Sequence, residues 1–345
     1  MSSALREDIG FEGRSNIFLP CEPGSKVVKH GVPRTSVSSR SHSLGMPLSH
    51  TGLAVFIVAI WGTNFVVIHV GLSQFPPFTF AALRFVLVSI PLLAFVPRPA
   101  VPRRTIVAYG LLIGVGQHGL TLYAMHGHIT AGLASLLIQG QAIFTIILAF
   151  LISGERPRVG NLVALGLCIA GVGLIGGHIG GDADILGLSL LLAAALSWAA
   201  GNLVAKQAGA VDMVGLVVWS SLAAVPPLVG AALAFEGPAI IGQRLVHANG
   251  YGWAALAWQA LGNSIFGYAA WNWLLTRHRA ADVAPMGLLV PVFGMSATAL
   301  LLGEAMPPWK LAAAALVLAG LCVNIWASRR PIAVAVNDGI VAAPQ

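Results

Sequence analysis

Hydrophobic residues along this chain are collected into runs of about twenty, separated by short polar or turn-forming segments. Each run is continuously apolar and lacks the alternation of a membrane β-strand. About twenty residues of helix cross a hydrocarbon layer of roughly 30 Å, and a helix satisfies its own backbone hydrogen bonds in lipid. The pattern predicts ten membrane-spanning helices, which start near Thr51, Phe78, Thr105, Ala131, Val159, Ile185, Val214, Gly252, Asp282 and Trp309.

Composition agrees with this interpretation. Hydrophobic residues fill 57% of the 345 positions and charged residues only 9%, whereas soluble domains carry about 25% charged residues. The fold class that we predict is therefore an all-α integral membrane protein, and a soluble helical protein is excluded.

Basic residues are distributed unevenly between the loops. If the N-terminus is cytoplasmic, the outer loops hold only Arg244 and Lys310. This asymmetry is the one expected from the positive-inside rule, so we expect a multi-pass protein with both termini in the cytoplasm. The net charge of +7 then needs no nucleic-acid partner. The inner loops and the C-terminal tail hold Arg98, Arg103, Arg104, Arg156, Arg158, Lys206, Arg277, Arg279, Arg329 and Arg330.

The N-terminal segment, residues 1–49, is rich in Ser, Pro, Gly and basic residues and lacks an apolar core for a signal peptide. We expect it to be a disordered polar leader. Met46 lies just before the first span and is an alternative translation start. We divide the remainder into a first repeat at residues 50–180, a second at 185–328 and a cytoplasmic tail at 329–345.

Two halves of the chain match in their first helices. Trp61 precedes His69 by eight residues, and Trp198 precedes Lys206 by the same interval. Between these pairs lie Asn64 and Asn202. The matching order of residue types predicts an internal repeat.

The ends of the two halves match as well. Glu155 and Glu304 each follow a glycine, and each precedes an Ala-Gly pair by the same interval, at residues 170–171 and 319–320. Each half contains an odd number of predicted spans, so the second half must cross the membrane inverted. We therefore predict two inverted five-helix repeats, whose exchange of conformations is typical of transporters.

Helix-breaking residues occur in matching spans. Gln139, Gly140 and Gln141 interrupt span four, while Pro291 and Gly294 interrupt span nine. Paired breaks of this kind indicate a central binding site. A glutamine offers a donor and an acceptor and suits a small zwitterion, although the same side chain also serves in interhelical hydrogen bonds.

Intramembrane ionisable residues are functional candidates. His69 and Lys206 either direct cations into one cavity or extend to the interfaces. Arg84 requires either the outer interface or a ligand that bears a carboxylate. The polar residues within spans are Asn64, His69, Arg84, His118, Gln139, Gln141, Asn202, Asn263, Asn272 and Asn324.

The candidate residues fall into two groups. The candidates for the substrate cavity are Trp61, Asn64, His69, Gln139, Gln141, Trp198, Asn202 and Pro291. The candidates for gating or coupling are Arg84, Glu155, Lys206 and Glu304, of which the two glutamates could instead cap helices.

Catalytic and metal chemistry find no support. The twelve acidic residues lie in loops, tails or span ends, and no Gly-x-Ser-x-Gly elbow accompanies the intramembrane histidines. Cys21, Cys168 and Cys322 lack the spacing of a zinc site or a disulfide framework. We expect no enzyme activity, no metal and no cofactor. Forty glycines favour close helix packing within a monomer over dimerisation.

Four stretches carry a family resemblance: WGTNFVVIHVGL, AGLASLLIQGQAIFT, SWAAGNLVAKQ and VAPMGLLVPVFGMSATALLLGE. They resemble the EamA family of the drug/metabolite transporter superfamily over residues 51–327. Residues 131–145 and 283–304 look most like the bacterial exporters of cysteine and O-acetylserine. Members of the family commonly carry Lys at the position of His69, so this chain replaces a fixed charge with a titratable one.

The resemblance implies a ten-helix exporter of the bacterial inner membrane that works by alternating access and is driven by the proton gradient. Its expected partners are a small-molecule substrate (an amino acid or related metabolite), protons and the lipid bilayer. One alternative is a drug or sugar exporter of the same fold. Alternatives of another class are an intramembrane enzyme and a membrane scaffold, which would not need inverted halves.

Overall fold

A computed structural model describes residues 46–153, 158–209 and 212–329. Every regular element in these ranges is a helix, and eight helical segments are long and apolar enough to cross a membrane. Each of them begins within three residues of a predicted start. The segments are Leu48–Gln74, Arg103–Met125, Ala131–Ile152, Val159–Gly176, Ile185–Gln207, Met213–Glu236, Pro285–Leu302 and Pro308–Ala327.

Several of these segments comprise more than one element. The first is α1 (Leu48–Gln74), the fourth α7 (Val159–Gly176), the fifth α8 (Ile185–Gln207) and the last α15 (Pro308–Arg329). The composite segments contain α3 (Arg103–Tyr109), η1 (Gly110–Gly119), α4 (Leu120–Met125), α5 (Ala131–Leu137), η2 (Ile138–Gly140), α6 (Gln141–Ser153), α9 (Met213–Ala231), η3 (Ala232–Glu236), η5 (Ala284–Leu288) and α14 (Leu289–Leu302), which α13 (Ala280–Val283) precedes.

Other helices lie between these segments. Helix α2 (Pro77–Ser89) is short and ends where Pro91 follows, since proline lacks an N–H and clashes with the preceding turn. The second is a continuous run of α11 (Gly250–Ala257), η4 (Trp258–Phe266) and α12 (Gly267–Arg277). The third is α10 (Pro238–His247), which has no buried residue and was not predicted.

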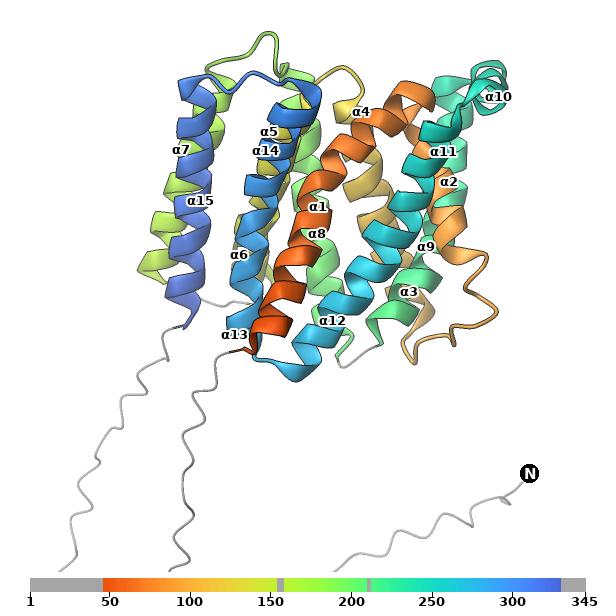
Figure 1. Cartoon of the computed structure of the whole chain (residues 1–345). Helices are drawn as coiled ribbons and strands as arrows, with labels where there is room; N and C mark the ends of the chain where they lie inside the picture. The colour runs from red at the N-terminus through yellow and green to blue at the C-terminus, as the bar shows by residue number, and fades with distance from the viewer. Residues whose placement is uncertain (1–45, 154–157, 210–211, 330–345) are drawn as a thin grey trace, which may run out of the picture. The chain divides into compact units, whose positions relative to one another are not determined.

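The helices form a bundle in which segments far apart in sequence pack together (Figure 1). Helix α7 lies along α15 at one side, while α1 packs on α14 and α2 on α9. The described chain begins and finishes at one end of this bundle, which we call the terminal end. The other end, where α10 lies, is the opposite end.

Glycines allow the closest approach at the centre of the bundle. A Cβ added to Gly62 of α1 would lie 2.5 Å from the carbonyl oxygen of Val290, and one added to Gly294 of α14 would lie 2.6 Å from Cβ of Ser135. No side chain fits at such distances without a backbone shift. Helices α1, α5 and α14 therefore make a tightly packed centre.

The irregular turns only partly follow the prediction. In span four the 3₁₀ turn η2 lies at the predicted break. In span nine the prediction was wrong in detail, because the irregular turn is η5, and α14 continues through Pro291 and Gly294. Pro291 is the third residue of α14, where a backbone N–H has no partner within the helix. A proline is therefore tolerated there.

Three further irregular segments, all π-helical, were not predicted. Element η3 ends the segment that contains α9, whereas η1 and η4 lie in the third predicted span of each half. Such turns are rare and are frequently found at functional sites. The space between η1 and η4 is therefore a candidate for a functional site.

Candidate functional site

A small buried cavity lies where η1 and η4 meet α2 and α9. It leaves about 20 Å³ for the centres of water molecules, which is room for about one of them. Its lining includes the side chains of Arg84, Phe85, Tyr109, Ile113, His118, Val217, Ser220, Ser221, Ser264 and Tyr268. The cavity is thus formed by the second and third predicted spans of both halves.

Arg84 supplies the positive charge of this cavity. Its side chain is 2% exposed, and its Nε and Nη2 atoms donate to Oγ of Ser264 over 3.3 Å and 2.8 Å. The hydroxyl of Ser264 in turn donates to the backbone carbonyl of Gln259 over 2.8 Å. A buried guanidinium is therefore held by a neutral oxygen, and no Asp or Glu lines the described cavity.

The side chain of Gln259 connects this cavity to a predicted residue. Gln259 Nε2 donates to Oδ1 of Asn64 over 2.9 Å, and Asn64 Nδ2 returns a weaker bond of 3.4 Å. Both residues are buried. Asn64 is therefore linked to the Arg84 and Ser264 pair through a single residue, Gln259.

Aromatic groups surround the charge. The guanidinium carbon of Arg84 lies 5.4 Å from the centre of the Phe85 ring. The ring of Phe85 meets the His118 ring edge-on, with centroids 5.5 Å apart. His118 is held by a 2.8 Å hydrogen bond between its Nδ1 and the carbonyl oxygen of Ile113. These contacts fix the ring orientations in a low-dielectric environment.

None of the eight predicted cavity residues lines this cavity. Trp61 comes near it: its Nε1 donates to the carbonyl of Asn263 over 3.4 Å, and its ring lies 5.9 Å from that of Tyr268. His69 and Lys206 are exposed, and Trp198 is half-buried. Their part in transport stays a prediction.

The predicted polar residues of span four pair with other helices. Gln139 Nε2 donates over 3.1 Å to the carbonyl of Gly287, four residues before Pro291. Pro291 has no N–H to donate to that carbonyl, which also accepts from the N–H of Leu289. Gln141 Oε1 accepts from Nδ2 of Asn202 over 3.0 Å. Gln139 and Gln141 thus connect span four of the first half to helices of the second half.

Of the two predicted gating glutamates, Glu155 lies outside the described residues. Glu304 accepts from the backbone N–H of Gly132, with its two oxygens at 3.0 Å and 3.3 Å. Gly132 is the second residue of α5, where the N–H groups of a helix lack internal partners and favour a negative charge. Glu304 therefore fastens the loop after α14 to the start of α5.

An ion pair and a hydrogen bond between histidine and aspartate add to the polar contacts at this opposite end. Lys310 is fully buried, and its Nζ lies 3.2 Å from a carboxylate oxygen of Asp182. Nδ1 of His128 lies 2.7 Å from a carboxylate oxygen of Asp184. The backbone N–H of Gly187 and the side chain of His128 form hydrogen bonds with the Asp184 carboxylate. Together these hydrogen bonds lower the pKa of Asp184. The loops before α5 and α8 are thereby tied together.

Burial differs between the two ends of span four. All seven residues of α5 are buried. In α6, Ile143 is the one buried residue among the side chains described, and residues 141–149 are otherwise half-buried on every face. A helix with lipid on one side and protein on the other shows a buried stripe. Residues 141–149 of α6 show no such stripe. The side of α6 that faces the other helices is therefore also incompletely covered by protein.

Most of the chain matches a known protein family and two bacterial relatives. The model of the EamA-like transporter family matches residues 50–177 and 185–326. The chain is 40% identical to a "Probable amino-acid metabolite efflux pump" of Salmonella typhimurium, covering 80% of this chain and 95% of that protein. It is 39% identical to the protein of the same name in Escherichia coli, covering 83% and 98%.

A protein of known crystal structure has a similar fold. The TM-score is 0.58 at 18% sequence identity, and the match covers 83% of this chain and 99% of the other. At this identity the likeness supports the fold alone. The two sequence relatives match over a similar share of their length at 40% and 39% identity.

Proposed function

Because the chain belongs to the EamA-like transporter family, we propose that it exports amino-acid metabolites, such as cysteine and O-acetylserine, by alternating access. It is an integral inner-membrane transporter and not an enzyme. The single observation that carries the substrate class is the 40% identity to an amino-acid metabolite efflux pump over 95% of that protein. A small zwitterion also suits a cavity that holds an arginine and several hydroxyl groups.

Ten spans in two inverted repeats form the second part of the proposal. Helix α2 and the run from α11 to α12 would complete the eight longer segments. The packing of the helices supports the symmetry: α1 packs on α14 as α8 packs on α6, and α1 packs on α11 and α12 as α8 packs on η1 and α4. Inverted repeats with a site between them are the usual arrangement of alternating-access transporters.

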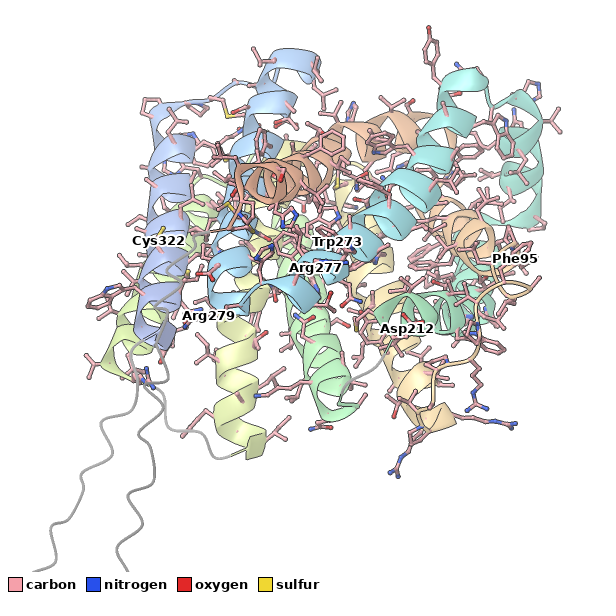
Figure 2. The ribbon with its side chains drawn as sticks, turned by 60° about the horizontal axis from the view of Figure 1, so that its bottom comes forward. Phe95, Asp212, Trp273, Arg277, Arg279 and Cys322 are labelled. Atoms are coloured by element: carbon pink, nitrogen blue, oxygen red, sulfur yellow. The ribbon has the colours of Figure 1, made fainter. Side chains whose placement is uncertain are left out.

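The orientation forms the third part. We place the terminal end in the cytoplasm, because the loops at that end carry basic residues. Arg277 and Arg279 lie there, with the guanidinium carbon of Arg277 4.1 Å from the centre of the Trp273 ring (Figure 2). The half-covered α6 would then face the cytoplasm, and the buried α5 the periplasm. Export starts from such a state, in which the solute enters from the inside.

Export from cells tests the substrate class. The chain is expressed in a bacterium that overproduces cysteine, and extracellular thiols and O-acetylserine are measured against an empty vector. We expect both to rise in proportion to the amount of protein in the membrane. Unchanged export at proven membrane abundance would reject these substrates. Proteoliposomes with an imposed pH gradient then test whether protons drive the transport, as the family resemblance implies.

A further inference from the structure

We propose that Arg84 binds the carboxylate group of the exported solute, with the hydroxyls of Tyr109 and Tyr268 as additional donors. The inference rests on the proposed function, since it names the solute group that this cavity recognises. The sequence left Arg84 open between anchoring at the outer interface, gating or coupling, and a ligand that bears a carboxylate; we choose the last of these and name the groups that would bind it.

Arg84 is a buried cation whose counter-charge is missing. Its hydrogen bonds all go to Ser264, and the described residues supply no partner for its Nη1 atom. Burying a guanidinium without an anion costs several kcal/mol, even after relaxation. An arginine retained under these conditions is suited to an anionic ligand, and its planar fork suits a carboxylate in particular.

Ser264 positions the guanidinium and cannot neutralise it. The hydroxyl hydrogen of Ser264 is donated to the carbonyl of Gln259, so the oxygen lone pairs face Nε and Nη2 of Arg84. This contact fixes one edge of the guanidinium. The remaining donor edge is then available to a ligand in the cavity.

Two phenols add donors to the same space. Tyr109 is 4% exposed, Tyr268 is half-buried, and both line the cavity. The described residues offer neither hydroxyl a hydrogen-bond partner. An ionised carboxylate accepts hydrogen bonds and donates none. Arg84 and the two phenols therefore supply the donors that a carboxylate needs.

The facing wall is suited to the other end of a zwitterion. Ser220 and Ser221 of α9 donate their hydroxyl hydrogens to the carbonyl of Val217, over 3.2 Å and 2.6 Å. Their oxygen lone pairs remain as acceptors, which an ammonium group requires. An α-amino acid could thus lie between the arginine and the serines.

The internal repeat places different polar groups at matching positions of the two halves. Lys206 follows His69 by 137 residues (206 − 69), and Ser221 follows Arg84 by the same interval (221 − 84). The repeat thus places a cation in one half and a hydroxyl in the other. Matching positions of opposite chemistry would hold a zwitterion in one direction while the halves exchange conformations.

The present volume fits only part of such a solute. About 20 Å³ holds one water or a carboxylate oxygen, so binding of a whole amino acid must widen the space. An inorganic anion such as chloride would fit without widening. The experiment therefore has to separate a carboxylate from a simple anion.

Transport kinetics give the first arm of the test. Uptake of radiolabelled L-cysteine into inside-out vesicles is measured with cysteine methyl ester or cysteamine as competitors, neither of which carries a carboxylate. We expect L-serine to compete and these two compounds to fail. R84K should raise KM about tenfold, because it keeps the charge and loses the fork, and R84Q should abolish uptake.

Matched variants guard this result. Arg244→Gln removes the same charge from the exposed helix α10 and should leave KM unchanged. Ser264→Ala should raise KM with little change in maximal rate, and Ser264→Thr should restore it. Competition by cysteamine equal to that of L-serine, or an unchanged KM in R84Q, would overturn the inference and leave the proposed export of cysteine intact.

Thermal stability of the purified protein gives the second arm, which needs no transport. Sodium formate should raise the Tm of the wild type. Sodium chloride at the same ionic strength should not raise it, and neither should formamide, which is neutral, at the same concentration as formate. R84Q should lose the formate shift. If the wild type transports no cysteine but shows this pattern, the substrate proposal fails and the carboxylate site stands. A chloride shift equal to that of formate would overturn the carboxylate inference.

Discussion

The two ends of span four contrast in how they are covered. The segment α5, at the opposite end, is buried over its whole length, whereas residues 141–149 of α6, at the terminal end, are half-buried except for Ile143, and residues 150–152 are exposed. Span nine shows the same contrast. Val290, Pro291 and Gly294 of α14 are buried, while the described side chains of η5 are half-buried.

The difference indicates that the bundle is sealed at one end and loosely packed at the other. The sealed end holds the Glu304 contact with Gly132 and the ion pair of Lys310 with Asp182. A transporter that worked by alternating access would need such contacts to be breakable, since the same helices must later part there. Three substitutions test this comparison, and each weakens packing or a polar contact at the centre or at the sealed end of the bundle.

The largest effect should come from the packing centre. Gly294→Val places a side chain where a Cβ would lie 2.6 Å from Cβ of Ser135. Overpacking of this kind costs about 1–3 kcal/mol, so we expect a lower Tm in detergent and loss of export. Gly166→Val is the control, because that exposed glycine has nothing within 4 Å. Equal Tm values for both variants would refute tight packing at Gly294.

A smaller effect should follow from the polar contact at the seal. Glu304→Ala removes the acceptor of the Gly132 N–H, and loss of a helix cap costs about 1 kcal/mol. That shifts an equilibrium roughly fivefold. We expect a cysteine placed at Leu136 to react about five times faster with a maleimide in the Glu304→Ala background. Glu304→Gln keeps an acceptor oxygen and should give a smaller increase, and identical rates in all backgrounds would count against the seal.

The smallest effect should be a pH dependence at the same end. The pKa of Asp184 is lowered by the N–H of Gly187 and by His128, so its ionised form stabilises the fold. That stability is complete above the ordinary pKa of 3.8 and is lost as the pH falls through the lower folded value. Asp184→Asn should therefore lower Tm slightly at pH 7 and flatten its decline below pH 3.8. An equally steep decline in the variant would assign the acid sensitivity to other groups.

The helices could be predicted because lipid imposes a simple pattern on them. The starts expected at Ala131, Val159 and Ile185 coincide with the starts of helical segments in the structure. Twenty apolar residues admit few alternatives in a membrane. Breaks were less predictable, because a proline in the first turn of α14 continues the helix and the run of glycines in η1 does not distinguish a π-helix from an α-helix.

The cavity was harder to predict than the helices. Arg84 was identified from its charge, but its hydrogen-bond partner Ser264 and the cavity residue Tyr268 lie in a different half of the chain. Single serines and tyrosines in apolar spans are common and carry no signal alone. The adjacent pair Ser220 and Ser221, of which Ser221 lies at the repeat interval from Arg84, was the pattern in the sequence that could have indicated the site.

The most direct test of alternating access compares both ends of span four in one experiment. Single cysteines replace Thr145 of α6 or Ser135 of α5 in a background without native cysteines, and a membrane-impermeant maleimide is added to inside-out vesicles or to intact cells. Without solute, Thr145→Cys should react in vesicles and Ser135→Cys in neither preparation. When L-serine is added at a saturating concentration, labelling of Thr145→Cys in vesicles should fall and labelling of Ser135→Cys in cells should rise. Labelling that ignores the solute at both positions would contradict the account.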